Sequence, residues 1–188
     1  MKALAKIVLL TLPVVLITVP AQSQESLWYE LNHKVRELHE QGQYSEATDV
    51  AKEALKVAEN TFGPDHPRTA TSLNNLGEVY RAQGKYAEAE PLYKRALEIG
   101  EKVFGPNHPN VATFLNNLGE VYRLQGKYAE AEPLYKRALE MLEEALGPEH
   151  PDVARMLENM VQLYKDMGNT DEAKSLEERA KSIRSKNQ

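Results

Sequence analysis

The chain has 188 residues, a formal net charge of −5 at pH 7 and no cysteine. Its pI of about 5.6 argues against a nucleic-acid-binding protein, which would need clustered basic side chains. The absence of cysteine excludes disulfides, thiolate zinc sites and a cysteine nucleophile. The length is enough for one domain.

The first 21 residues are typical of a secretory signal peptide. Lys2 and Lys6 precede an apolar run of 13 residues that ends at Val19. Such a run is shorter than the roughly 20 residues that a membrane-spanning helix needs. We expect cleavage after Ala21, or alternatively after Ser23, and a periplasmic or secreted protein with no stable membrane span after cleavage. The alternative is that the segment is retained as a membrane anchor.

The rest of the chain, residues 22–188, repeats with a period of 42 residues. Residues 63–104 and 105–146 align without a gap and are identical at 32 of 42 positions. Residues 22–62 and 147–188 follow the same register less closely. A period of this size is typical of stacked repeat arrays, because a single unit cannot bury its own apolar face.

Each unit is predicted to contain two helices. In the second unit, Pro67 suits the first turn of a helix, where its missing N–H is harmless. Gly84 then supplies the turn to the second helix. Gly77 and Gly119 are too small to fill a core, so we expect them to allow the close approach of a neighbouring helix. The apolar positions that recur at helical spacing in this unit are Ala70, Leu73, Leu76, Gly77 and Tyr80, then Ala89, Leu92, Tyr93, Ala96, Leu97 and Val103.

This pattern resembles the tetratricopeptide repeat, W-x2-L-G-x2-Y…A-x3-F. The period of 42 residues exceeds the usual 34, and with the "GPxHP" linkers and "LNNLGEVY" it is similar to a 42-residue subclass seen in kinesin light chains and many bacterial proteins. The resemblance implies an all-α, right-handed solenoid of about four helix-turn-helix repeats, whose first helices line a concave peptide-binding groove. The kinesin role itself is not carried over, because a secretory signal is incompatible with a cytosolic motor subunit. The matching residues are Leu73, Leu76, Gly77, Tyr80, Ala89 and Tyr93, then Leu115, Leu118, Gly119, Tyr122, Ala131 and Tyr135.

A polar stripe lies beside the apolar stripe on each first helix. Its members in the second unit are spaced 3, 4 and 3 residues apart, so they share one face. They match the groove-lining positions of the family. The alternative is a solvated face, where a pair such as Glu78 and Arg81 contributes a few tenths of a kcal/mol. The candidate groove residues are Asn32, Arg36, Thr71, Asn74, Glu78, Arg81, Thr113, Asn116, Glu120, Arg123, Arg155 and Lys165.

Asn32, Asn74 and Asn116 occupy the same position in three successive units. An amide donates and accepts hydrogen bonds, so such a row could pair with a peptide backbone of any sequence. The basic residues further along the stripe, Arg81, Arg123 and Lys165, would bias the groove toward acidic ligands, although neighbouring glutamates dilute that bias.

Three histidines repeat in the linkers, at His66, His108 and His150. A shared metal site is one interpretation. However, equivalent positions in stacked units should lie roughly 8–10 Å apart, whereas zinc ligation needs bonds of roughly 2 Å. We therefore predict a structural role at the helix entrances, consistent with the adjoining prolines.

No nucleophile elbow, phosphate-binding glycine loop or dinucleotide fingerprint occurs, so the sequence predicts no cofactor and no enzyme. A hydrolase with an unrecognised site is the remaining catalytic alternative. We interpret the chain as a non-catalytic adaptor for an unidentified protein or peptide partner, with no nucleic-acid partner.

The outer units suggest how the array ends. The last helix has lost much of its apolar stripe, as a terminal cap requires. Trp28 stands where later units carry alanine, and we expect it to cover an exposed end. The alternative is a self-associating structural protein that forms homo-oligomers through its ends, with Trp28 as a sticky end, or through its convex face.

Overall fold

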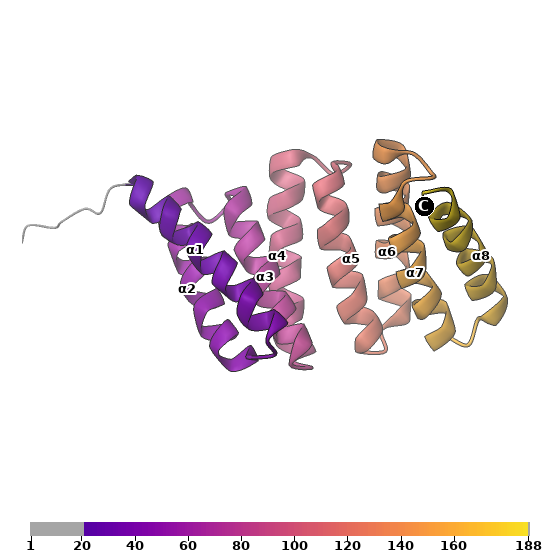
Figure 1. The fold of residues 1–188 in the computed structure, drawn as a ribbon, viewed down its shortest axis with the longest axis horizontal. Coiled ribbons are helices and arrows are strands. Elements are labelled where there is room, and N and C mark those ends of the chain that lie inside the picture. The colour runs from indigo at the N-terminus through magenta and orange to yellow at the C-terminus, as the bar shows by residue number, and fades with distance from the viewer. Residues whose placement is uncertain (1–20, 188) are drawn as a thin grey trace, which may run out of the picture.

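The computed structural model describes residues 21–187, and in that range it contains eight helices and no strand. Figure 1 shows the helices stacked side by side along one long axis, from α1 at one end to α8 at the other. The predicted all-α solenoid of four helix pairs is confirmed. The helices are α1 (Ala21–Glu40), α2 (Tyr44–Phe62), α3 (Pro67–Ala82), α4 (Tyr86–Phe104), α5 (Pro109–Leu124), α6 (Tyr128–Leu146), α7 (Pro151–Asp166) and α8 (Thr170–Lys186).

The backbone contacts show which side of the array is concave. Every helix packs against the next one in the chain, and the first helices of successive pairs also approach one another, α1 with α3, α3 with α5 and α5 with α7. Within residues 21–187 the second helices make no such approach to one another. Because the first helices lie closer together than the second helices, the array curves with α1, α3, α5 and α7 on its inner side.

The linker histidines begin the first helices. Nδ1 of His66 accepts a hydrogen bond from the backbone N–H of Arg68 at 3.1 Å, and Pro67 is the first residue of α3. His108 and His150 repeat the contact at 3.2 and 3.1 Å. Each histidine thereby satisfies one of the N–H groups that a helix start leaves free. The predicted structural role of these histidines is confirmed.

A glycine turn reverses the chain between the two helices of each pair. After α3, the N–H of Lys85 bonds to the carbonyl of Tyr80 and the N–H of Gly84 to that of Arg81, both at 2.9 Å. This is the Schellman arrangement, which needs a residue in the left-handed region. Gly84 supplies it with a φ of +72°.

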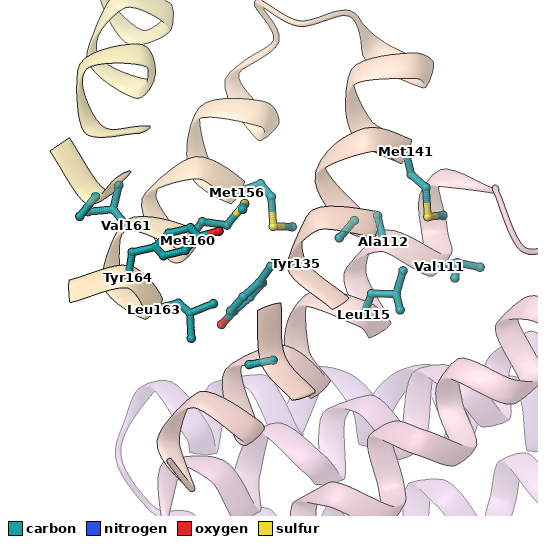
Figure 2. Packing of buried hydrophobic residues seen from close by; sticks show 13 residues of the cluster. Val111, Ala112, Leu115, Tyr135, Met141, Met156, Met160, Val161, Leu163 and Tyr164 are labelled. Atoms are coloured by element: carbon teal, nitrogen blue, oxygen red, sulfur yellow. The ribbon is translucent and has the colours of Figure 1, made fainter. Parts of the chain in front are cut away.

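Inside the two central pairs, a glycine faces a tyrosine ring. A Cβ on Gly77 would lie 2.9 Å from the ring of Tyr93, and one on Gly119 would lie 3.2 Å from the ring of Tyr135. Close approach at these glycines was predicted, although it is a ring of the partner helix that approaches. Figure 2 shows Tyr135 between the apolar residues of α5 and those of α7, including Leu163.

The packing between successive helix pairs, here called a joint, combines large residues on one side with small residues on the other. At the first joint Trp28 is buried, with Nε1 donating to Ser72 Oγ at 2.8 Å. At the second joint an alanine replaces the tryptophan and Phe114 replaces the serine, against Gly100. At the third joint alanine and Met156 share one cluster. The expectation that Trp28 covers an exposed end is wrong, because a small serine leaves room for it inside the first joint.

Residues 1–20 lie outside the part of the chain that the structure describes, so the predicted signal peptide does too, apart from Ala21, the first residue of α1. None of the helices between residues 21 and 187 has the length and apolar content that crossing a membrane requires.

Candidate functional site

Three hollows open along the first helices, one for each joint between pairs. The hollow between α1 and α3 has a volume of about 200 Å³, that between α3 and α5 about 370 Å³, and that between α5 and α7 about 130 Å³. Glu78 on α3 lines both the first and the last of these. The inner side of the array is therefore a continuous row of depressions rather than a flat surface.

A ladder of asparagine hydrogen bonds joins the first helices across the joints. The Oδ1 atoms of the three predicted asparagines accept from the Nδ2 atoms of a second asparagine in the following repeat. The bonds are Asn75 to Asn32 at 2.7 Å, Asn117 to Asn74 at 2.8 Å and Asn159 to Asn116 at 2.7 Å. The predicted row of asparagines lies on successive first helices, but its amide oxygens bond between repeats, which was not predicted, so it would offer a ligand chiefly its remaining donors.

Those donors are not equivalent. Asn32 is buried, and its Nδ2 donates to the carbonyl of Trp28 at 2.7 Å. Asn116 Nδ2 donates to Asn117 Oδ1 at 3.1 Å. Within residues 21–187, Nδ2 of Asn74 has no hydrogen-bond partner. The central asparagine is thus the rung that keeps a free donor.

Arg123 is already paired. Its guanidinium makes two hydrogen bonds to Glu120, at 2.8 and 2.9 Å, and a third to Asp166 of the next pair. These contacts raise the pKa of Arg123 above its ordinary value, the bond to Glu120 contributing most and outweighing burial. Burial raises the pKa of Glu120, but its bonds to Arg123 and to the Tyr135 hydroxyl lower it further, so the net direction is down. Arg123 is a joint residue, which argues against its predicted role in attracting acidic ligands.

The equivalent residues in the second repeat are not ion-paired. In the described range, Arg81 and Glu78 form no ion pair and are half-buried on the inner side of α3, although Arg81 lies close enough to Tyr93 and Glu120 to act on the pKa of each, in the lowering direction. The reason is that α5 ends in Leu124 where α7 has Asp166, so Arg81 lacks the partner that its counterpart finds. Together with Asn74, these two residues form a half-buried polar group in the middle of the inner side that makes few contacts between repeats.

The other predicted residues are distributed along the row of hollows. Arg36 lines the first hollow, Thr71 and Thr113 line the second, and Arg155 lines the third, where it pairs with Asp152 at 3.0 Å. Arg81, Glu120, Arg123 and Lys165, like the buried Asn32, line none of the three.

Sequence reasoning missed the apolar walls of the middle hollow, Phe104 and Phe114, and the basic residue at its edge, Arg68. Phe114 was hidden because it occupies a position that is serine in the second repeat, so the alignment of repeats marked it as variable. Sequence reasoning also missed the asparagines that donate in the ladder, Asn75, Asn117 and Asn159. The doubled asparagine in "LNNLGEVY" was the available signal for the first two.

The second helices present a different electrostatic pattern. Ion pairs connect each to the next, Arg95 with Glu59 and Arg137 with Glu101, both at 2.6 Å, and Arg179 with Glu143. One arginine–glutamate pair at each step therefore connects the second helices, although other charges there, such as Glu98 and Glu140, form no ion pair within the described residues. No group of three or more His, Asp or Glu residues in the range 21–187 is arranged to hold a metal ion.

Paired helices stacked in one curved array define an α-solenoid built from helical repeats. The pattern of the tetratricopeptide repeat family matches residues 37–102, 72–144 and 111–186, and the chain belongs to that family. Its fold is the right-handed α-solenoid expected from the sequence. Members of the family are generally non-catalytic scaffolds for protein interactions, and no enzyme family is indicated.

Solved structures show the same fold. BtubC (BKLC) from P. vanneervenii is 25% identical, with a TM-score of 0.77 over 86% of this chain, which spans 65% of that protein. A putative kinesin light chain with nearly identical TPR-like repeats from Podosopora anserina is 23% identical, with a TM-score of 0.77 over 92% of this chain and 79% of that one. A variant of that Podosopora anserina protein is 24% identical, with a TM-score of 0.74 over 84% of this chain and 74% of the variant. No curated protein matches the chain.

Proposed function

We propose that the chain is a non-catalytic adaptor that binds an extended segment of a partner protein along the inner side of its solenoid. The observation that carries the proposal is the contrast between the two sides. Arginine–glutamate ion pairs join each second helix to the next, while on α3 Nδ2 of Asn74 has no hydrogen-bond partner within residues 21–187 and Glu78 and Arg81 form no ion pair there. Asn74 lines the middle hollow, and Glu78 lines the other two.

The geometry suits an extended chain. First helices stack roughly 8–10 Å apart, and an extended peptide advances roughly 3.3 Å per residue. About every third residue of the segment would therefore meet a new hollow. Phe104 and Phe114 favour an apolar side chain in the middle hollow, because they offer no partner to a charged group, and Arg68 at its edge already pairs with Glu25 at 2.6 Å.

Selection from a random peptide library against the purified protein tests the proposal. We expect the selected peptides to bind the variants Asn74→Ala and Arg81→Gln about tenfold more weakly, the loss of one well-placed polar contact. Lys56→Gln is the matched control, because Lys56 is exposed on α2, away from the inner side. Equal affinity for wild type and both inner-side variants would remove this region from the mechanism.

Arg123→Gln separates binding from stability. Since Arg123 bridges Glu120 and Asp166, its loss should lower the melting temperature more than it lowers peptide affinity. The reverse outcome would show that the paired guanidinium contacts the ligand directly.

We also propose export of the protein, based on the basic and apolar character of residues 1–21. The product recovered from outside the cytoplasm should begin at Gln22, which mass spectrometry would establish. A membrane-bound product that retains Met1 would contradict cleavage and favour the anchor.

A further inference from the structure

The first helix of the array carries charges where the later first helices carry buried residues. Positions of α5 that face the preceding repeat include Phe114 and Leu118, both buried. The equivalent positions on α1 are Glu30 and Lys34, both exposed. Charged side chains therefore replace buried apolar ones at these two positions, although Tyr29 of α1 stays 54% exposed. Trp28 itself is buried, which argues against it as the sticky end considered from the sequence.

The last helix pair also carries charged residues in place of apolar ones, on the side of α8 that faces away from α6. Glu177, Lys181 and Arg184 of α8 replace a tyrosine and two leucines of α6. With Glu158 of α7 they line a hollow of about 350 Å³. In the internal repeats this place is filled by the first helix of the next pair, as the contact of Gly100 with Phe114 shows. The free side of α8 thus carries a hollow with charged walls at the place where an internal repeat receives the next first helix.

The charges of the two ends match in the register of the internal joints. The ion pair between Arg123 and Asp166 joins the third and fourth repeats. The residue equivalent to Arg123 in the last repeat is Lys165, and the residue equivalent to Asp166 in the first repeat is Glu40. The same contact between two copies would therefore pair Lys165 with Glu40. In the same way, the Gly100–Phe114 contact becomes Arg184 with Glu30, and the asparagine bond becomes Glu158, the acceptor, with His33, the donor. A further contact, Leu118 with Tyr93, becomes Lys34 with Glu177.

We propose that a second copy of the chain docks α1 into the hollow of α7 and α8 and so continues the solenoid from one molecule into the next. Each of the four substituted contacts brings opposite charges, or a donor and an acceptor, together in the geometry that the internal joints already use. The joint is head-to-tail, so both copies keep a free end and the assembly is open-ended. This inference is independent of peptide binding on the inner side.

The association is expected to be weak and salt-sensitive. In a single copy, Arg184 already pairs with Glu158 at 3.0 Å and Lys34 with Glu46 at 3.6 Å, so docking exchanges exposed pairs, each of which contributes little. Glu37, which replaces a buried valine, would lie near Glu177 and opposes docking. Screening at high salt removes the attraction between exposed charges.

Sedimentation velocity over a concentration series provides the first test. At about 0.01 M salt, where charges act over roughly 30 Å, the average mass of the purified protein should rise with concentration. At about 1 M salt it should return to that of one chain. A single-chain mass at every concentration in low salt would overturn the proposal, as would association that salt leaves unchanged.

Charge reversal identifies the surface. Arg184→Glu and Glu30→Arg should each lower the association constant about tenfold. An equimolar mixture of the two variants should recover association, since each supplies the intact partner of the other. Lys56→Glu, with the same charge change on the exposed side of α2, should associate like wild type.

A second pair of charges, Lys165 and Glu40, provides a separate test, so that a local folding defect at Arg184 or Glu30 cannot account for both results. Lys165→Glu and Glu40→Lys should repeat the pattern of loss alone and recovery when mixed. Association of the single variants that equals that of wild type, or a mixture that stays monomeric, would show that the two ends do not meet in this register.

Discussion

The central and outer repeats solve the same packing problem in different ways. In the central repeats a glycine on the first helix leaves space that a tyrosine ring on the second helix fills, Gly77 with Tyr93 and Gly119 with Tyr135. In the outer repeats the first helix carries a valine and the second a different residue, the pairs being Val35 with Ala51 and Val161 with Glu177. In the first repeat the bulk has moved from the second helix to the first, whereas in the last repeat Glu177 lines the open hollow beside α8. Where a neighbouring repeat covers both helices, the fold requires a summed volume at this point and not a particular residue.

The packing between successive repeats should also depend on summed volume, and substitutions between the first and second repeats can test this. Trp28→Ala should cost about 3–5 kcal/mol of stability, because a large buried side chain leaves a cavity that its neighbours fill only in part. Adding Ser72→Met should recover part of this loss, since alanine and methionine share the third joint. Urea unfolding would measure both variants. A double variant no more stable than Trp28→Ala would show that joint volumes cannot be exchanged.

A smaller effect is expected inside a central repeat. Gly119→Leu should cost on the order of 1–3 kcal/mol, because even a Cβ would lie 3.2 Å from the ring of Tyr135. Adding Tyr135→Ala should relieve the overpacking and reproduce the arrangement of the first repeat. Thermal unfolding of the single variant without any loss of stability would contradict the close approach of ring and glycine.

The linker histidines should contribute equally in the three repeats that carry them. His108→Ala should cost about 1 kcal/mol, since it leaves an N–H at the start of α5 without its acceptor. His108→Asn is the control, because a short amide can accept the same bond. Circular dichroism melts of the corresponding variants at His66 and His150 would compare the repeats, and a cost only at His108 would argue against a shared capping role.

The smallest effect concerns pH. The bond from Lys94 holds the pKa of Glu90 at about 2, against burial and with help from Lys127. Since this folded pKa lies below the unfolded value near roughly 4.3, its stabilisation is present above that pH and is lost as pH falls toward about 2. Lys127→Met should raise the pKa of Glu90 but not that of Glu132, whose partners are Lys136 and Tyr164. Carboxyl NMR titration would measure both, and an unmoved Glu90 would contradict the contact.

The sequence was sufficient for the fold because the helix spacing repeats in four units with a period of 42 residues, and the linker prolines recur three times in the same register. It was less informative for the candidate site. Asn74 and Asn116 look equivalent in the alignment, yet only the former keeps a free donor. Arg81 and Arg123 also look equivalent, but only the latter forms an ion pair with a carboxylate of the next repeat, Asp166. Periodicity assigns residues to a face, whereas the state of each side chain depends on its neighbour across the joint.

The complementary joints also restrict how such a chain can lengthen. A duplicate of residues 105–146 inserted after itself would place a copy of Phe114 against Leu142, where the present joint has Gly100, and would overfill the space. A duplicate of residues 63–104 inserted after itself would place a copy of Ser72 against Gly100, where Phe114 now packs, and would leave a cavity there. New repeats can therefore be copied whole, but each insertion must be followed by a compensating substitution at the seam, and the ten differences between the central repeats include those at positions 72 and 100.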